Sequence, residues 1–209
     1  MVYFAFLLSV VSKLHRLILN AHPAAAGEKN MLGFWPLQLC IKSKVTDTPL
    51  LLEVLRKHPV AASLVDEHGR RTIHYAASRN MDMSFVKALL EADKKGASAQ
   101  DKNGQIPLHL AVIRGAIELA TILLKFHPNG VMDVDRYGMV ALNYAIENDA
   151  SMDMITLLVQ SNPLCVRNII TGNRTVLHHA VEFRRSTEII QLLVNSFPES
   201  ARVQESVLG

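Results

Sequence analysis

Apolar residues recur along the chain in helix-length stretches that are separated by polar turns. Four of these stretches are rich in Leu, Ile and Val and lie at 85–90, 117–124, 154–159 and 188–194. Shorter stretches that end in Ala or Cys lie at 35–40, 71–76, 106–111, 140–145 and 175–180. Apolar residues at helical spacing are typical of amphipathic helices. The pattern therefore predicts helix pairs, in which a short helix precedes a longer and more apolar one.

Proline residues mark the ends of the longer helices at regular intervals. Proline lacks an N–H and biases the residue before it away from the helical region, so it ends a helix. The prolines concerned are Pro23, Pro59, Pro128, Pro163 and Pro198. Their spacings are 36, 69, 35 and 35 residues, and Lys94 stands where the missing copy of the double step would fall. A period this regular predicts an array of repeated units.

A polar turn begins seven residues after each of these proline positions. Three turns, at 66–69, 101–104 and 135–138, start with Asp and end with Gly. Asp can accept a hydrogen bond from the backbone two residues on, and Gly adopts the positive φ that such a turn requires. The turn at 170–173 has lost the Asp and carries Asn173 in place of Gly, whereas the turn at 30–33 keeps only the Gly.

The unit of turn, short helix, loop and longer helix, with 34–36 residues per copy, resembles the ankyrin repeat. The core motif of that family is Thr-Pro-Leu-His-x-Ala. Residues 106–111 miss only the Thr, and residues 175–180 miss only the Pro. Five copies stand in register, and the resemblance covers essentially the whole chain. It implies an all-α solenoid of about six stacked helix–loop–helix units, joined by β-turn or hairpin-like loops.

The resemblance also implies how the chain is divided. We expect residues 33–209 to form the ankyrin repeat array, with units that start near residues 33, 69, 104, 138 and 173. Residues 1–32 are expected to form a degenerate or partial N-terminal repeat. The chain begins and ends inside the repeat pattern, and neither end shows the polar outer face that terminal units need. We therefore expect a fragment, a truncated gene model, or an array whose ends a partner covers.

The almost wholly apolar residues 1–11 leave a second interpretation open. A signal peptide or membrane anchor contains such a stretch. No positive charge precedes it, however, and Lys13, His15 and Arg16 follow it. The apolar pattern also continues through residues 14–19 at the spacing of a buried helical stripe. We expect a repeat helix and no membrane association, with a secreted or anchored protein as the alternative.

The composition indicates which compartment and which class of partner to expect. Because 49% of the residues are apolar and 20% charged, the chain has the composition of a folded protein rather than a disordered one. A net charge of +3, with basic residues only in pairs, does not indicate a nucleic-acid partner. Two cysteines form no disulfide framework, so we expect a reducing compartment, the cytoplasm.

No residue pattern predicts a catalytic, cofactor or metal site. His74, His109 and His178 are too widely spaced along a solenoid to share one metal ion. The resemblance implies instead that they hydrogen-bond backbone between adjacent units. His179 is next to His178, but adjacent helical residues point about 100° apart, and no Cys or carboxylate stands at ligand spacing. Cys165 has no His or Asp placed in the sequence to activate it. We expect a protein that is not an enzyme and has no cofactor.

The candidate functional residues are those that the repeat motif leaves free. In the family, the turn tips and the end of the first helix vary and line the concave side. The corresponding residues are Glu67, His68, Arg70, Ser78, Arg79, Lys102, Asn103, Gln105, Ile113, Arg114, Arg136, Tyr137, Met139, Glu147, Asn148, Arg174, Glu182 and Phe183. Arg, Tyr, Met and Phe are enriched in binding patches.

The predicted function is therefore a non-enzymatic scaffold or adaptor that binds a protein partner on its concave face. The alternative is a regulatory ankyrin segment of a larger signalling or membrane protein, whose catalytic or channel part lies outside this chain. The identity of the partner does not follow from the sequence.

Overall fold

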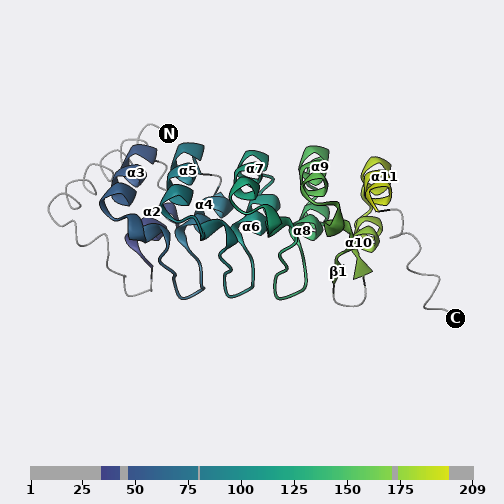
Figure 1. The fold of residues 1–209 in the computed structure, drawn as a ribbon, viewed down its shortest axis with the longest axis horizontal. Helices are drawn as coiled ribbons and strands as arrows, with labels where there is room; N and C mark the ends of the chain where they lie inside the picture. The colour runs from purple at the N-terminus through teal and green to yellow at the C-terminus, as the bar shows by residue number, and fades with distance from the viewer. Residues whose placement is uncertain (1–33, 43–46, 80, 171–173, 198–209) are drawn as a thin grey trace, which may run out of the picture.

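The computed structural model describes residues 34–42, 47–79, 81–170 and 174–197. In these ranges the chain forms a row of helix pairs, stacked side by side (Figure 1). The predicted N-terminal repeat at 1–32, with its apolar stretch, lies outside the described residues. The unit starts predicted near residues 33 and 173 also lie outside them.

Each pair consists of a first and a second helix, which lie in two rows. The first helices are α2 (Pro36–Lys42), α4 (Thr72–Arg79), α6 (Pro107–Ile113), α8 (Ala141–Glu147) and α10 (Val176–Glu182). The second helices are α3 (Thr48–Lys57), α5 (Met83–Ala92), α7 (Ile117–Phe126), α9 (Met152–Ser161) and α11 (Thr187–Ser196). Hairpin loops extend beyond the row of first helices (Figure 1). The expected all-α solenoid is confirmed.

Polar side chains fix where most of the second helices begin. The capping residues are Asp47, Asp82, Ser151 and Ser186. The Asp82 carboxylate, for example, accepts a hydrogen bond of 2.8 Å from the backbone N–H of Ser84. Such caps satisfy N–H groups that have no partner within the helix. Helix α7 begins after Ala116 without a capping side chain.

The second helices end in residues with non-helical backbone, as the proline pattern predicts. His58 has φ −138° and Asn162 has φ −161°, and a proline follows each of them. Short 3₁₀ helices follow, each beginning with a proline: η2 (Pro59–Ala62), η4 (Pro128–Val131) and η5 (Pro163–Arg167). Asp93 has φ −135° although Lys94 follows it, and η3 (Gly96–Ser98) comes next. The helix end predicted near residue 94 is confirmed.

The core lies between the helices of successive units. Ala76, Ala111, Ala145 and Ala180 occupy the same register in four first helices and are completely buried. Small side chains at this register let neighbouring helices approach closely. Helix α4 accordingly packs against both α2 and α6, and α8 packs against α6 and α10. The second helices complete the core with larger apolar side chains such as Phe85, which is fully buried.

The loop before α10 contains a short β-hairpin. Its strands are β1 (Ile169–Ile170) and β2 (Arg174–Thr175), and they pair antiparallel with Ile169 opposite Thr175. The hairpin coincides with the turn predicted at 170–173, whose central residues lie outside the described ranges. Across the part of the chain that the structure describes, none of the helices is long and apolar enough to span a membrane.

Candidate protein-binding face

The hairpins between units are built around buried aspartates. One oxygen of Asp66 accepts hydrogen bonds from the backbone N–H groups of His68 at 2.8 Å and Arg70 at 2.9 Å. Asp101 and Asp135 make the same pair of bonds to the backbone two and four residues further on. The glycine that closes each of the three turns has a φ between 73° and 76°. The turn chemistry expected from the Asp and Gly positions is therefore confirmed.

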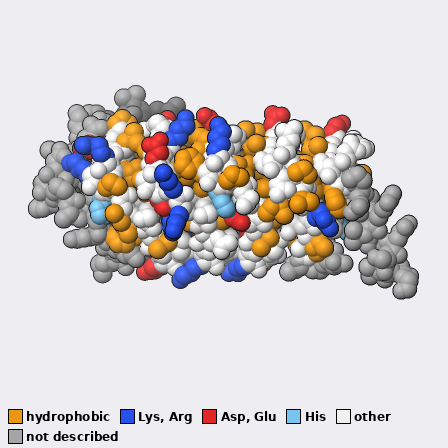
Figure 2. Space-filling model, viewed as in Figure 1, with side chains coloured by type: hydrophobic (Ala, Val, Ile, Leu, Met, Phe, Trp, Pro, Cys, Tyr) orange, Lys and Arg blue, Asp and Glu red, His pale blue; other side chains and the backbone are white. Residues whose placement is uncertain are grey.

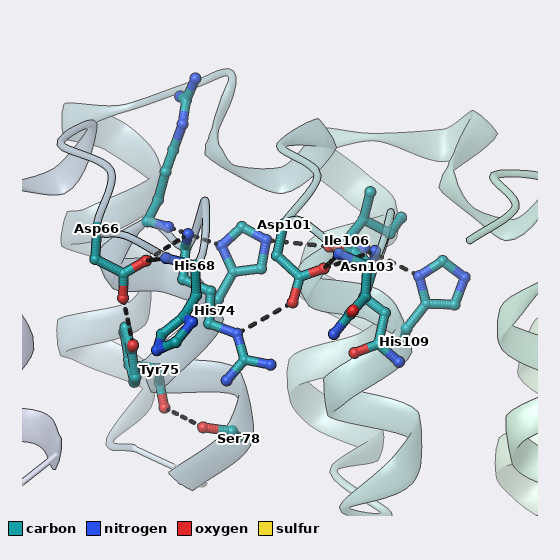
Figure 3. Close-up of polar contacts among 12 residues, drawn as sticks. Asp66, His68, His74, Tyr75, Ser78, Asp101, Asn103, Ile106 and His109 are labelled. Atoms are coloured by element: carbon teal, nitrogen blue, oxygen red, sulfur yellow. Dashed lines mark hydrogen bonds and ion pairs between the residues drawn. The ribbon is translucent and has the colours of Figure 1, made fainter. Parts of the chain in front are cut away.

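The second oxygen of each aspartate ties the hairpin to another element. The hydroxyl of Tyr75 donates to Asp66 (Figure 3), and the hydroxyl of Tyr144 donates to Asp135 at 2.6 Å. Asp101 has Leu110 at the tyrosine register, and Arg70 of the preceding hairpin donates to it instead, at 3.1 Å. These contacts fix the hairpins relative to the first helices.

The Asp66 carboxylate is held in its charged form. Burial raises the pKa of the Asp66 carboxyl, but the hydrogen bonds from Tyr75 and the backbone outweigh this effect and hold that pKa below its usual value. Burial, followed by the hydrogen bond to the neighbouring aspartate, raises the pKa of Tyr75 and of Tyr144 above the usual value. Both tyrosines therefore remain hydrogen-bond donors near neutral pH.

Successive hairpins are also joined directly through their backbones. The N–H of Lys102 donates to the carbonyl of His68 at 2.9 Å, and the N–H of Arg136 donates to the carbonyl of Asn103 at 2.9 Å. A Cβ atom on Gly104 would lie 2.9 Å from the backbone nitrogen of Arg136, closer than real Cβ contacts. Glycine is required there by both the backbone angle and the close approach of the next hairpin.

Two of the three motif histidines, His74 and His109, connect adjacent units, as the resemblance implies. Nδ1 of His74 accepts a hydrogen bond from the N–H of Arg71 at 3.1 Å, so the ring proton is on Nε2. Nε2 lies 3.0 Å from the carbonyl of Ala99 and 3.2 Å from that of Gln105, in the next unit. His109 repeats the arrangement and reaches the carbonyl of Asp133 at 3.2 Å. Burial lowers the pKa of both rings, so both are neutral near pH 7. Their role is to hydrogen-bond one unit to the next.

Two amides occupy the histidine register elsewhere, and the sequence pattern did not indicate that role. Gln38 accepts from the N–H of Trp35 and donates to the carbonyls of Leu64 and Arg70. Asn143 is shorter. Its Oδ1 accepts hydrogen bonds from the N–H of Val140 and, at 2.9 Å, from Nδ2 of Asn168, but its own buried Nδ2 has no hydrogen-bond partner among the described residues. Gln38 thus reaches backbone carbonyls of the next unit directly, whereas Asn143 is joined to the next unit through the side chain of Asn168.

The expected site residues divide into three groups by exposure. The exposed ones are Glu67, His68, Arg79, Lys102, Arg114, Arg136, Tyr137, Asn148, Glu182 and Phe183. The half-buried ones are Arg70, Ser78, Asn103, Gln105, Ile113, Glu147 and Arg174. Met139 is only 9% exposed, so it offers little surface to a partner.

Several of these residues are brought together across unit boundaries. Gln105 donates to the hydroxyl of Tyr144 at 2.9 Å. Arg136 donates to Asn103 at 3.0 Å and to the hydroxyl of Tyr137 at 2.7 Å. Arg70 forms an ion pair with Asp101, so its charge stabilises the contact between two hairpins. We call the surface made by the hairpin tips and the C-terminal ends of the first helices the hairpin face.

The C-terminal end of the hairpin face contains a buried histidine, His179, which the sequence analysis considered only as a metal ligand. His179 stands at the tyrosine register, but Ile170 replaces the aspartate that would receive its hydrogen bond. Its ring is 2% exposed, and Nδ1 has no hydrogen-bond partner in the described part of the chain. The nearest carboxylate oxygen, from Glu147, is 4.0 Å away. Burial lowers the pKa of this ring, which keeps it neutral.

The chemistry of metal sites and nucleophiles is not assembled in the described ranges. No group of three or more His, Cys, Asp or Glu side chains there could hold a metal ion. Cys165 is completely buried, and burial raises the pKa of its thiol to about 12. A thiol with that pKa is protonated and unreactive near neutral pH.

These features define a stacked helical repeat protein in which backbone hydrogen bonds join the hairpins at 66–70, 101–105 and 135–139. A family model for ankyrin repeats, described as three copies, matches residues 8–129 and 73–168. The matched residues make up more than half of the chain, and the chain belongs to the ankyrin repeat family. Ankyrin repeats are protein–protein interaction modules and are typically not catalytic.

One relative adds a local similarity. The chain is 32% identical over 93 residues to the phosphocholine transferase AnkX of Legionella pneumophila subsp. pneumophila (strain Philadelphia 1). The match covers 43% of this chain and 9% of AnkX. The similarity therefore concerns a small part of that larger protein.

Proposed function

We propose that this chain is a non-enzymatic scaffold or adaptor that binds a protein partner on its hairpin face. The observation that carries the proposal is the direct joining of neighbouring hairpins, through Lys102 to His68 and Arg136 to Asn103. Since the backbone is fixed, the exposed tip side chains are presented in a fixed order. A long surface of this kind suits an extended macromolecular partner better than a small molecule.

The exposed side chains of the hairpin face are of the kind that carry binding energy. Tyr137 is 49% exposed and Phe183 is 38% exposed. Arg114 is exposed at the end of α6. Tyr and Arg are enriched among residues that dominate the affinity of protein interfaces. We also place this function in the cytoplasm, because the chain has free cysteines and no disulfide framework.

The test is capture of partners by the full chain and by the double variant Tyr137→Ala, Arg114→Ala. Both side chains are exposed, so the helical circular dichroism should be unchanged. Loss of an interface hot spot costs about 2 kcal/mol or more, so capture should fall roughly thirtyfold or more. The matched control is Lys87→Ala, Lys125→Ala, which removes two exposed side chains from the second helices. Equal capture by the two double variants would count against this face.

A further inference from the structure

Three hairpins present charged side chains at the same register, and we call Glu67, Lys102 and Arg136 the tip row. Each is the second residue of its turn, directly after the buried aspartate, and each is exposed. Acidic and basic groups gather along the lower edge of the molecule, where the hairpins end (Figure 2). The order along the array is one negative charge followed by two positive charges.

The spacing of the tip row follows from the hydrogen bonds between hairpins. Lys102 and Asn103 are adjacent, which separates their Cα atoms by about 3.8 Å. Asn103 is bonded through its backbone to Arg136 like a neighbouring strand, which adds about 4.8 Å. The same construction links Glu67, through His68, to Lys102. Successive members of the tip row are therefore at most about 9 Å apart, the value reached when the two steps run in one line along the array.

This interval matches one peptide conformation in particular. A polyproline II helix has three residues per turn and rises about 3.1 Å per residue, so every third side chain faces the same way at about 9.3 Å. A β-strand turns every third side chain to the opposite face. A peptide in polyproline II conformation can therefore keep every third side chain in contact with successive hairpin tips.

The tip charges are available to such a peptide. In the described part of the chain, the side chains of Glu67 and Lys102 make no hydrogen bond or ion pair. The Arg136 guanidinium is held by Asn103 and Tyr137 and lies 4.8 Å from the centre of the tyrosine ring. Two of its five N–H groups are thereby engaged, and the others can bind a carboxylate. An arginine held in place loses less side-chain entropy when it binds.

We propose that the hairpin face binds an extended, polyproline II-type peptide with two acidic residues and one basic residue at intervals of three. The acidic residues pair with Arg136 and Lys102, and the basic residue pairs with Glu67. The inference rests on the proposed function and specifies the partner's chemistry. The negative charge of Glu67 in the row disfavours nucleic acid, whose phosphates are uniformly negative.

The test uses fluorescein-labelled synthetic peptides and fluorescence polarisation with the full chain at low ionic strength. One peptide has the sequence Pro-Glu-Pro-Pro-Glu-Pro-Pro-Lys-Pro, and a second has the reverse order of charges along the chain. A control peptide of the same composition places the three charges side by side. One of the two spaced peptides should bind about tenfold more tightly than the control, since each exposed ion pair contributes modestly and three act together.

A variant of the protein makes the test specific. Lys102→Glu with Arg136→Glu should abolish the preference for the spaced acidic peptides and create one for Pro-Lys-Pro-Pro-Lys-Pro-Pro-Lys-Pro. Equal binding of spaced and clustered peptides, or no binding of any, overturns the inference. Partner capture separates the two proposals. If this variant captures the partner normally while Tyr137→Ala, Arg114→Ala does not, the proposed function stands and the peptide class is wrong.

Discussion

The close stacking of the hairpins predicts that two glycines with the same backbone angle differ in how well they tolerate alanine. Gly104 has φ 74° and Gly138 has φ 76°. An alanine in this left-handed region costs about 1–2 kcal/mol at either position. The neighbouring hairpin, in contrast, approaches only one of them. We therefore compare Gly104→Ala with Gly138→Ala.

The additional cost at Gly104 comes from the next hairpin. A Cβ atom there would lie 2.9 Å from the nitrogen of Arg136 and 3.1 Å from the Cα of Asp135, both of them backbone atoms. A shift that relieves this contact lengthens the 2.9 Å hydrogen bond from Arg136 to Asn103. Losing such a bond costs about 0.5–1.5 kcal/mol. At Gly138 the closest atom would be the carbonyl oxygen of Ile169 at 3.8 Å, an ordinary contact.

Gly104→Ala should therefore lower the free energy of unfolding by about 1 kcal/mol more than Gly138→Ala, the value of the strained hydrogen bond. The assay is urea unfolding of the full chain, followed by circular dichroism at 222 nm. Since both variants have the same backbone strain, the difference reports the contact between hairpins. Equal destabilisation by the two substitutions would refute the reasoning.

Two further predictions concern pH and the loops between paired helices. Burial lowers the folded-state pKa of His74 and His109 below the unfolded value of about 6.5. Their contribution to stability is complete above that pH and falls below it, by up to about 1.4 kcal/mol per pH unit for each ring. Urea midpoints should therefore be lower at pH 5.5 than at pH 7.5. Equal midpoints would contradict the conclusion that His74 and His109 are neutral in the folded protein. Arg184 has φ 52° and is exposed, so Arg184→Gly should raise the free energy of unfolding by about 0.5–1 kcal/mol, and a decrease would show that its left-handed backbone is not strained.

The repeat architecture could be predicted because its signals are local. The Asp and Gly of a turn, and the proline after a helix, each act within a few residues. Their regular spacing then revealed the period, even where Lys94 replaces proline. The helix ends and hairpins follow this prediction closely, because each depends on its own short segment of chain.

The parts of the site that could not be predicted depend on contacts between units. Arg70 pairs with Asp101, 31 residues away, because Leu110 cannot supply the hydroxyl that a tyrosine would. Gln38 replaces a histidine because its amide is long enough to reach the corresponding carbonyls of the next unit, those of Leu64 and Arg70. Met139 resembles a surface residue in the sequence but is buried beside its hairpin. Such details require the three-dimensional arrangement of neighbouring units.

Hydrogen–deuterium exchange of the full chain, with and without its captured partner, tests the central claim most directly. Binding on the hairpin face should slow exchange in the hairpins at 66–70, 101–105 and 135–139 and at the C-terminal ends of α4, α6 and α8. Helices α5, α7 and α9 should exchange as before. Slower exchange confined to those second helices, with unchanged hairpins, would contradict the account.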